Sequence, residues 1–194
     1  MIWAVVLAAG ASSRMTAALG PKALLHAPDG RTFLQRIADS ARAGGAGGVV
    51  IVVGPPHADA IKRALPAGCA SAYNPLPDRG MLSSVQAGVS TLPAACSAAL
   101  VWPVDIPFVR PDTVRAILSA APGKLVIPQH GKRGGHPIRI GRARFAELTT
   151  LDPTRGLKAL VEAHPDRVQR LPTNDPGVLV DIDTPEDFAR ANRA

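Results

Sequence analysis

Short apolar segments alternate with helix-like segments along this chain, and this alternation is the feature that most restricts its fold. The apolar segments are rich in β-branched residues and lack polar alternation, which is typical of strands covered on both faces. The expected strands are residues 2–8, 48–53, 70–73, 98–102, 124–128 and 168–171. A loop with an inserted strand is expected between residues 131 and 141.

Helix-like patterns fill the intervals between these strands. The expected helices are residues 33–43, 58–65, 81–92, 113–120, 145–149, 156–164 and 186–192. Thr32 and Thr184 stand where helix caps are expected, and Pro185 suits a first helical turn. Alternating strands and helices imply right-handed crossovers, so we expect an α/β fold, a three-layer α/β/α domain with a mainly parallel sheet. A length of 194 residues fits a single domain spanning 1–194.

The composition limits the class of partner. The formal net charge is +7, but the basic residues are scattered, and only 4% of residues are aromatic. This charge fits a protein that handles phosphorylated anions, one that binds nucleic acid, or a basic surface without specific meaning, so it does not identify a partner by itself. The scarcity of aromatics argues against a stacking platform for single-stranded nucleic acid, and together with the motifs below the charge favours small phosphorylated anions over nucleic acid. Two cysteines exclude a disulfide framework and a Cys-rich zinc module. No apolar run approaches the roughly 20 residues of a membrane span, so we expect a cytoplasmic protein without a membrane partner.

The segment after the first strand carries the clearest signal for chemistry. Its small residues would let backbone N–H groups approach a phosphate, and two cations follow. The segment consists of Leu7, Ala8, Ala9, Gly10, Ala11, Ser12, Ser13 and Arg14, with Lys22 downstream. An ordinary strand-to-helix turn is the alternative. The spacing matches neither the dinucleotide-binding fingerprint nor the P-loop.

This segment, L-A-A-G-A-S-S-R-M with Lys22, resembles the signature loop of the MobA-like NTP transferase superfamily, closest to the molybdenum-cofactor cytidylyltransferases. Four further segments resemble motifs of that family in the same order: G-M-L-S-S-V-Q-A-G at 80–88, P-V-D-I-P at 103–107, G-H-P at 135–137 and D-I-D-T-P-E-D at 181–187. The five motifs span almost the whole chain. One departure is that the loop between Arg14 and Lys22 is about three residues longer than the family pattern, which bears on how Lys22 reaches the phosphates.

The resemblance implies a Rossmann-like nucleotidyltransferase fold and assigns roles to individual residues. Arg14, Lys22 and Asp105 would be catalytic, and Asp105 with Asp181 would hold Mg²⁺. We expect the side chains of Asp181 and Asp183 to diverge, so that only one faces the site, and we interpret Asp183 as a helix cap.

Further roles follow from the same resemblance. Residues 7–14 and Lys22, together with Gly80 and Ser84, would bind the nucleotide, with Ser84 at its base. Arg133 and His136 would approach the acceptor substrate, although a solvated loop histidine is an equal alternative.

The implied function is transfer of a nucleoside monophosphate from an NTP to a phosphorylated acceptor with release of pyrophosphate. The L-A-A-G form favours CTP, and molybdopterin is the favoured acceptor, with a sugar phosphate as an alternative within the class. A nucleotide-binding regulatory protein without turnover is the alternative from another class. An NAD(P)-linked oxidoreductase is weaker, because no dinucleotide fingerprint occurs. The oligomeric state is left open.

Overall fold

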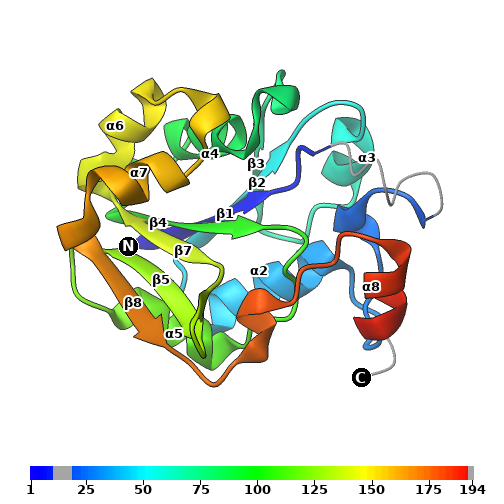
Figure 1. Cartoon of the computed structure of the whole chain (residues 1–194). Coiled ribbons are helices and arrows are strands. Elements are labelled where there is room, and N and C mark those ends of the chain that lie inside the picture. The colour runs from blue at the N-terminus through cyan, green and yellow to red at the C-terminus, as the bar shows by residue number, and fades with distance from the viewer. Residues whose placement is uncertain (11–18, 192–194) are drawn as a thin grey trace.

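The computed structural model describes residues 1–10 and 19–191. Within these residues eight strands form one mixed sheet in the order β3-β2-β1-β4-β7-β5-β6, and β8 pairs with β5 (Figure 1). The strands are β1 (Ile2–Leu7), β2 (Gly48–Val53), β3 (Ala70–Tyr73), β4 (Ala98–Pro103), β5 (Leu125–His130), β6 (Arg133–Gly134), β7 (Ile138–Gly141) and β8 (Val168–Pro172). Every strand expected from the sequence is present, and its ends lie within two residues of the expected ones.

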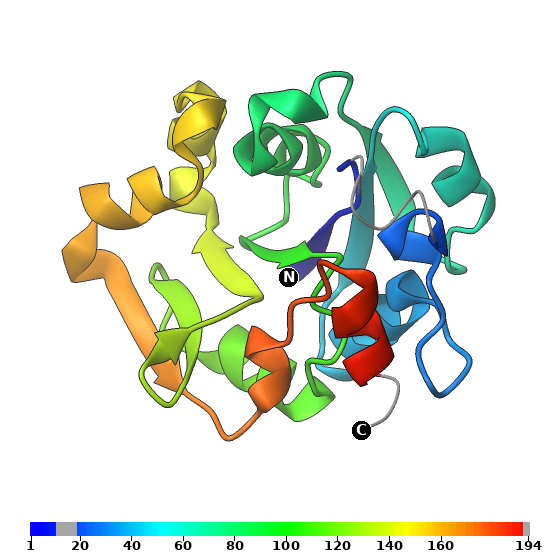
Figure 2. The same ribbon diagram turned by 45° about the vertical axis from the view of Figure 1, so that its right-hand side comes forward.

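Helices cover both faces of the sheet, which confirms the predicted three-layer α/β/α fold (Figures 1 and 2). The longer helices are α2 (Phe33–Ala43), α3 (Ala58–Arg63), α4 (Met81–Ser90), α5 (Pro111–Ser119), α6 (Phe145–Thr150), α7 (Lys158–Ala163) and α8 (Pro185–Ala191). One face packs against α2, α3, α5 and α8, and the other against α4, α6 and α7.

Strand β1 shows how the sequence divides between these two cores. Ala4 and Val6 join the core beneath α2, whereas Val5 and Leu7 join the core beneath α4. Successive side chains of a strand point to opposite faces, so an unbroken apolar run is required wherever both faces are covered. This arrangement explains why the β1 segment is apolar throughout.

The parallel strands bring their carboxyl ends to one edge of the sheet. Strand β1 pairs in parallel with β2 on one side and with β4 on the other, and Leu7 aligns with Pro103. The chain order therefore reverses at β1, where β2 and β3 extend to one side and β4 to the other. Ligands bind at such switch points in open α/β sheets, so the fold places the loops after β1 and β4 where a site is expected.

Strand β7 departs from the parallel pattern. It runs antiparallel to both β4 and β5 and lies between them, within the region where the sequence indicated an inserted strand. Arg139 on β7 is 3% exposed, and its guanidinium donates to the carbonyl oxygens of Leu118, Ala120 and Ala121 at the end of α5. A cation at the carboxyl end of a helix satisfies carbonyls that have no partner within the helix. Arg139 is thus a structural residue of the core.

No described helix combines the length and apolar character required to cross a membrane.

The position of Arg139 leads to a stability prediction. Arg139→Met preserves the length of the side chain but leaves three carbonyl oxygens without their donor. We expect the free energy of unfolding to fall by about 2–4 kcal/mol in urea denaturation. The control Lys132→Met removes an exposed cation and should change it by less than about 0.5 kcal/mol. Equal stabilities for the two variants would contradict the capping role.

Candidate active site

A pocket of about 310 Å³ lies at the carboxyl ends of β1 and β4. Its lining residues come from segments far apart in the chain: Leu7, Ala9, Gly10, Lys22, Pro77, Met81, Ser84, Pro103, Val104, Asp105 and Asp183. Six of the residues expected from the sequence to form the site are among them. Ala8 is not, because its side chain points to the other face of the sheet and is 4% exposed there.

Only part of the expected phosphate loop is among the described residues. Ala11, Ser12, Ser13 and Arg14 lie outside the described residues. Their roles therefore stay predictions, as does the effect of the longer loop on how Arg14 and Lys22 act together.

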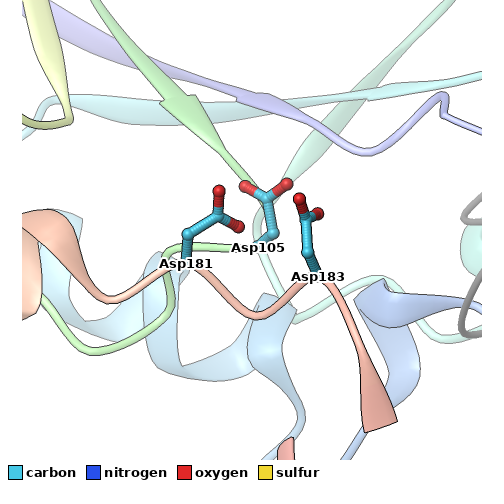
Figure 3. Close-up of side chains that lie close together, drawn as sticks. All are labelled: Asp105, Asp181 and Asp183. Carbon is cyan, nitrogen blue, oxygen red and sulfur yellow. The ribbon is translucent and has the colours of Figure 1, made fainter. Parts of the chain in front are cut away.

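Three carboxylates converge beside the pocket. One ligand oxygen from each of Asp105, Asp181 and Asp183 lies within 4.8 Å of the other two. Asp105 follows β4, and the other two stand in the segment that leads into α8 (Figure 3). Figure 3 shows all three side chains directed toward the same space.

The expectation that Asp181 and Asp183 diverge was wrong. Residues i and i+2 of an extended segment project to the same side, and the residue between them projects to the other. Ile182 is that residue: it is 1% exposed in the core, and its N–H donates to the carbonyl oxygen of Asp105 at 2.9 Å. The burial of Ile182 therefore directs both neighbouring carboxylates into the site.

Interpreting Asp183 as a helix cap was also wrong. The hydroxyl of Thr184 accepts from the N–H of Asp187 at 3.2 Å, and the Asp187 carboxylate accepts from the N–H of Thr184 at 2.9 Å. This reciprocal pair is a capping box, so Thr184 is the cap of α8. The Asp183 carboxylate instead contacts Lys22.

Lys22 connects the phosphate loop to this acidic cluster. Its side chain is 9% exposed, and its Nζ lies 2.5 Å from Asp183 Oδ1 and 3.5 Å from Asp105 Oδ2. It therefore partly neutralises the cluster. When all four groups are ionised, the three carboxylates and the Lys22 ammonium together carry a net charge of −2.

The pKa values of Asp105 and Asp181 are raised. Burial raises the pKa of Asp105, and the Asp183 charge adds to this while Lys22 opposes it. Partial burial, followed by the charges of Asp105 and Asp183, raises the pKa of Asp181 to about 6. Asp181 lies at the exposed rim of the cluster, so solvent screens part of this effect. Crowded carboxylates of this kind gain from a bound cation.

The donor set fits a hard divalent cation. Mg²⁺ and related ions prefer carboxylate oxygens, are bound by one or two protein carboxylates, and complete their coordination with water and substrate phosphates. Asp105 and Asp181, the expected ligands, both lie in the cluster, and Asp183 is a third oxygen donor that the sequence reasoning had set aside.

The other wall of the pocket is the start of α4. Gly80 precedes α4 with φ +103°, and a Cβ there would lie 3.0 Å from the carbonyl oxygen of Pro153. Ser84 lines the pocket and is 5% exposed. Its Oγ accepts from Nδ2 of Asn74, a buried residue directly after β3. Sequence reasoning missed Asn74, because its role depends on contacts with α4 that the local sequence does not reveal.

Arg133 and His136 are not among the residues that line this pocket. Arg133 is exposed on β6, and His136 is partly buried beside the turn that contains Val178, to whose carbonyl oxygen its N–H donates. Burial lowers the pKa of His136. Their contact with an acceptor stays a prediction.

Residues 4–168 match the MobA-like NTP transferase domain, which covers most of the chain. The chain belongs to this family. Two curated relatives differ in how much of their own length matches this chain. Nicotine blue oxidoreductase from Paenarthrobacter nicotinovorans is 31% identical over 96% of this chain and 94% of its own length. The bifunctional protein GlmU from Bordetella petrii is 34% identical over 88% of this chain but 33% of its own, so this chain spans about a third of it.

Solved structures that resemble this chain share its fold over nearly their whole length. Rv0371c from Mycobacterium tuberculosis superposes with a TM-score of 0.86 at 29% identity, over 100% of this chain and 97% of that one. A nucleotidyl transferase from Methanothermobacter superposes with 0.84 at 25% identity, over 100% and 96%. A manganese complex of Rv0371c gives 0.81 at 28% identity, over 100% and 98%. These structures share the fold of this chain; one of them is named a nucleotidyl transferase and another holds manganese.

The Lys22 contacts lead to a prediction about metal affinity. Lys22→Met removes the ammonium that shares the oxygens of Asp105 and Asp183 with an incoming cation. We expect the variant to bind Mn²⁺ about tenfold more tightly than the unaltered protein in the absence of nucleotide, measured by calorimetric titration. Lys132→Met, which removes an exposed charge elsewhere, is the matched control. Unchanged or weaker Mn²⁺ binding by Lys22→Met would show that the ammonium and the metal do not compete.

The raised pKa of Asp181 leads to a prediction about stability and pH. The folded protein holds the Asp181 proton more tightly than the unfolded chain, so ionisation at this position destabilises the fold above about pH 6, and the penalty disappears as the pH falls toward 4. In chelator-treated protein, Asp181→Asn should therefore raise Tm at pH 7, and this gain should shrink as the pH falls from about 6 to about 4. The exposed-carboxylate control Asp59→Asn should lack this pH dependence. A gain in Tm that is constant across this window would contradict the assignment.

Proposed function

We propose that this protein is a Mg²⁺-dependent nucleotidyltransferase that transfers a nucleoside monophosphate from an NTP, with CTP favoured, to a phosphorylated acceptor. The observation that carries this proposal is the convergence of three carboxylates and Lys22 on the pocket at the ends of β1 and β4. Such a site has oxygen ligands for a hard cation and a buried ammonium for a polyphosphate, which are the two requirements of phosphoryl-type transfer.

The nucleotide would enter with its triphosphate against the loop after β1. Gly10 and the residues up to Ser13 would offer backbone N–H groups, and Arg14 and Lys22 would bind the β- and γ-phosphates. Lys22 lies in the pocket with Gly10 and contacts the carboxylates of Asp105 and Asp183. On nucleotide binding, its ammonium would exchange a carboxylate partner for a phosphate oxygen.

The acceptor phosphate would attack the α-phosphate in line and expel pyrophosphate. A phosphate monoester is already a nucleophile, so the protein needs no general base and acts through position and charge. Asp105 and Asp181, with Asp183 beside them, would hold the Mg²⁺, and the bound ion would supply positive charge to stabilise the phosphates during transfer. Arg14 and Lys22 would stabilise the pyrophosphate as it leaves.

The choice of CTP and of molybdopterin as acceptor rests on the resemblance of L-A-A-G to cytidylyltransferases. Arg133 and His136 would meet the acceptor. A sugar phosphate is the alternative acceptor, and nucleotide binding without turnover is the alternative function.

A redox activity is a second candidate, because the relative that matches this chain along nearly its whole length is named an oxidoreductase. The two candidates differ in substrate. A nucleotidyltransferase needs an NTP with a divalent cation and releases pyrophosphate. A pyridine-nucleotide oxidoreductase instead binds NAD(P)H and oxidises it, which lowers the absorbance of the NAD(P)H.

Replacement of the central carboxylate tests the proposal. With CTP, Mg²⁺ and molybdopterin, we expect Asp105→Asn to lower the rate of pyrophosphate release by about 100-fold or more, because one metal ligand is lost. The control Asp59→Asn, on the outer surface of α3, should retain the rate of the unaltered protein.

The same assay, extended over four NTPs and a sugar phosphate, defines the substrate. Unchanged release by Asp105→Asn would contradict the metal assignment. Binding of NTPs without turnover on either acceptor would favour a regulatory protein, and binding of NAD(P)H in place of every NTP would favour an oxidoreductase.

A further inference from the structure

Asn74 is a buried amide whose orientation is determined by its neighbours. It is 3% exposed, and its Oδ1 accepts from the backbone N–H of Leu76 at 3.0 Å. A backbone N–H can only donate, so the oxygen of the amide must face Leu76 and its NH₂ group must face the opposite way. Nδ2 then donates to Ser83 Oγ at 2.8 Å and to Ser84 Oγ at 2.9 Å.

These two bonds determine what each serine hydroxyl does next. A hydroxyl that accepts from Asn74 still has its own hydrogen to donate. Ser83 donates to the carbonyl oxygen of Gly80 at 2.8 Å, which secures the turn before α4. Among the described residues, the Ser84 hydroxyl donates no hydrogen bond, and Ser84 lines the pocket. Its hydrogen is therefore available to a ligand in that pocket.

We propose that Asn74 is a positioning residue that makes Ser84 a hydrogen-bond donor to the nucleobase of the bound NTP. This inference rests on the proposed function, together with the expectation from the sequence that Ser84 meets the base. A free hydroxyl can either donate or accept, so it would tolerate a carbonyl oxygen or an amino group equally. One of the two lone pairs of Ser84 is directed to Asn74. If the other accepted from an exocyclic amino group, the hydroxyl hydrogen would have no partner among the described residues, so Ser84 favours a base that presents a carbonyl oxygen or an unprotonated ring nitrogen at this point.

The substitution Asn74→Asp tests this polarity with almost no change of shape. A carboxylate at this position still accepts from the N–H of Leu76, but it also attracts the hydroxyl hydrogens of both serines. Ser84 would then present a lone pair to the pocket. At about pH 8, where the new carboxylate is ionised, we expect the dissociation constant for CTP with Mg²⁺ to rise about 10- to 100-fold.

A double-substitution cycle separates this effect from simple damage to the fold. In a Ser84→Ala background, Asn74→Asp should change the CTP dissociation constant less than about threefold, because the donor it reorients has gone. Asn74→Ala, which removes the amide without adding a charge, should weaken CTP binding by a smaller factor and show the same dependence on Ser84. Ser83→Ala is the matched control, since Ser83 accepts from the same amide but is not among the pocket-lining residues.

Inorganic tripolyphosphate supplies a probe without a base. Asn74→Asp should leave its affinity within about twofold of the unaltered protein, because the phosphates would meet the loop after β1. The proposal would be overturned if Asn74→Asp weakened the binding of CTP and of tripolyphosphate by the same factor. It would also be overturned if Asn74→Asp changed the CTP dissociation constant equally with and without the Ser84 hydroxyl. Either result would leave the proposed NTP binding intact. If the unaltered protein bound tripolyphosphate but no NTP, the proposed function would fail and the role of Asn74 with it.

Discussion

The hydrogen bond from the N–H of Ile182 to the carbonyl oxygen of Asp105 joins two parts of the chain on which the site depends. It ties the loop after β4 to the segment that returns toward α8, while the Ile182 side chain is anchored in the core. Because Ile182 points inward, Asp181 and Asp183 both point toward Asp105. A single buried apolar residue thus holds together three carboxylates that would repel one another, and Lys22 relieves part of that repulsion.

The positive charge of the chain divides between structure and site. Arg139 is buried and caps α5, and Arg110 lies 3.4 Å from the buried carboxylate of Asp175, which also accepts from the hydroxyl of Thr113. These cations stabilise helix ends and loops of the fold. Lys22 is different, since its partners are the carboxylates of the pocket. Net charge therefore indicated an anionic substrate only weakly, whereas the position of one lysine supports it directly.

Most of the architecture could be predicted because strands that are covered on both faces consist of unbroken apolar residues, as β1 and β4 do. Asp105 and Lys22 were also predictable, since each belongs to a motif at a strand end. The directions of Asp181 and Asp183 were predicted wrongly, although the apolar Ile182 between them indicates a shared direction, because residues i and i+2 of an extended segment project to the same side. Asn74 was missed because its importance lies in contacts with α4, which no local pattern reveals.

The most direct test of the account is a crystal structure with CTP and Mn²⁺, in which anomalous scattering locates the metal. The account predicts a manganese peak between the nucleotide phosphates and the carboxylates of Asp105 and Asp181 or Asp183, with the triphosphate against the loop after β1. A nucleotide bound away from this pocket, or a manganese peak that none of the three carboxylates contacts, would contradict it.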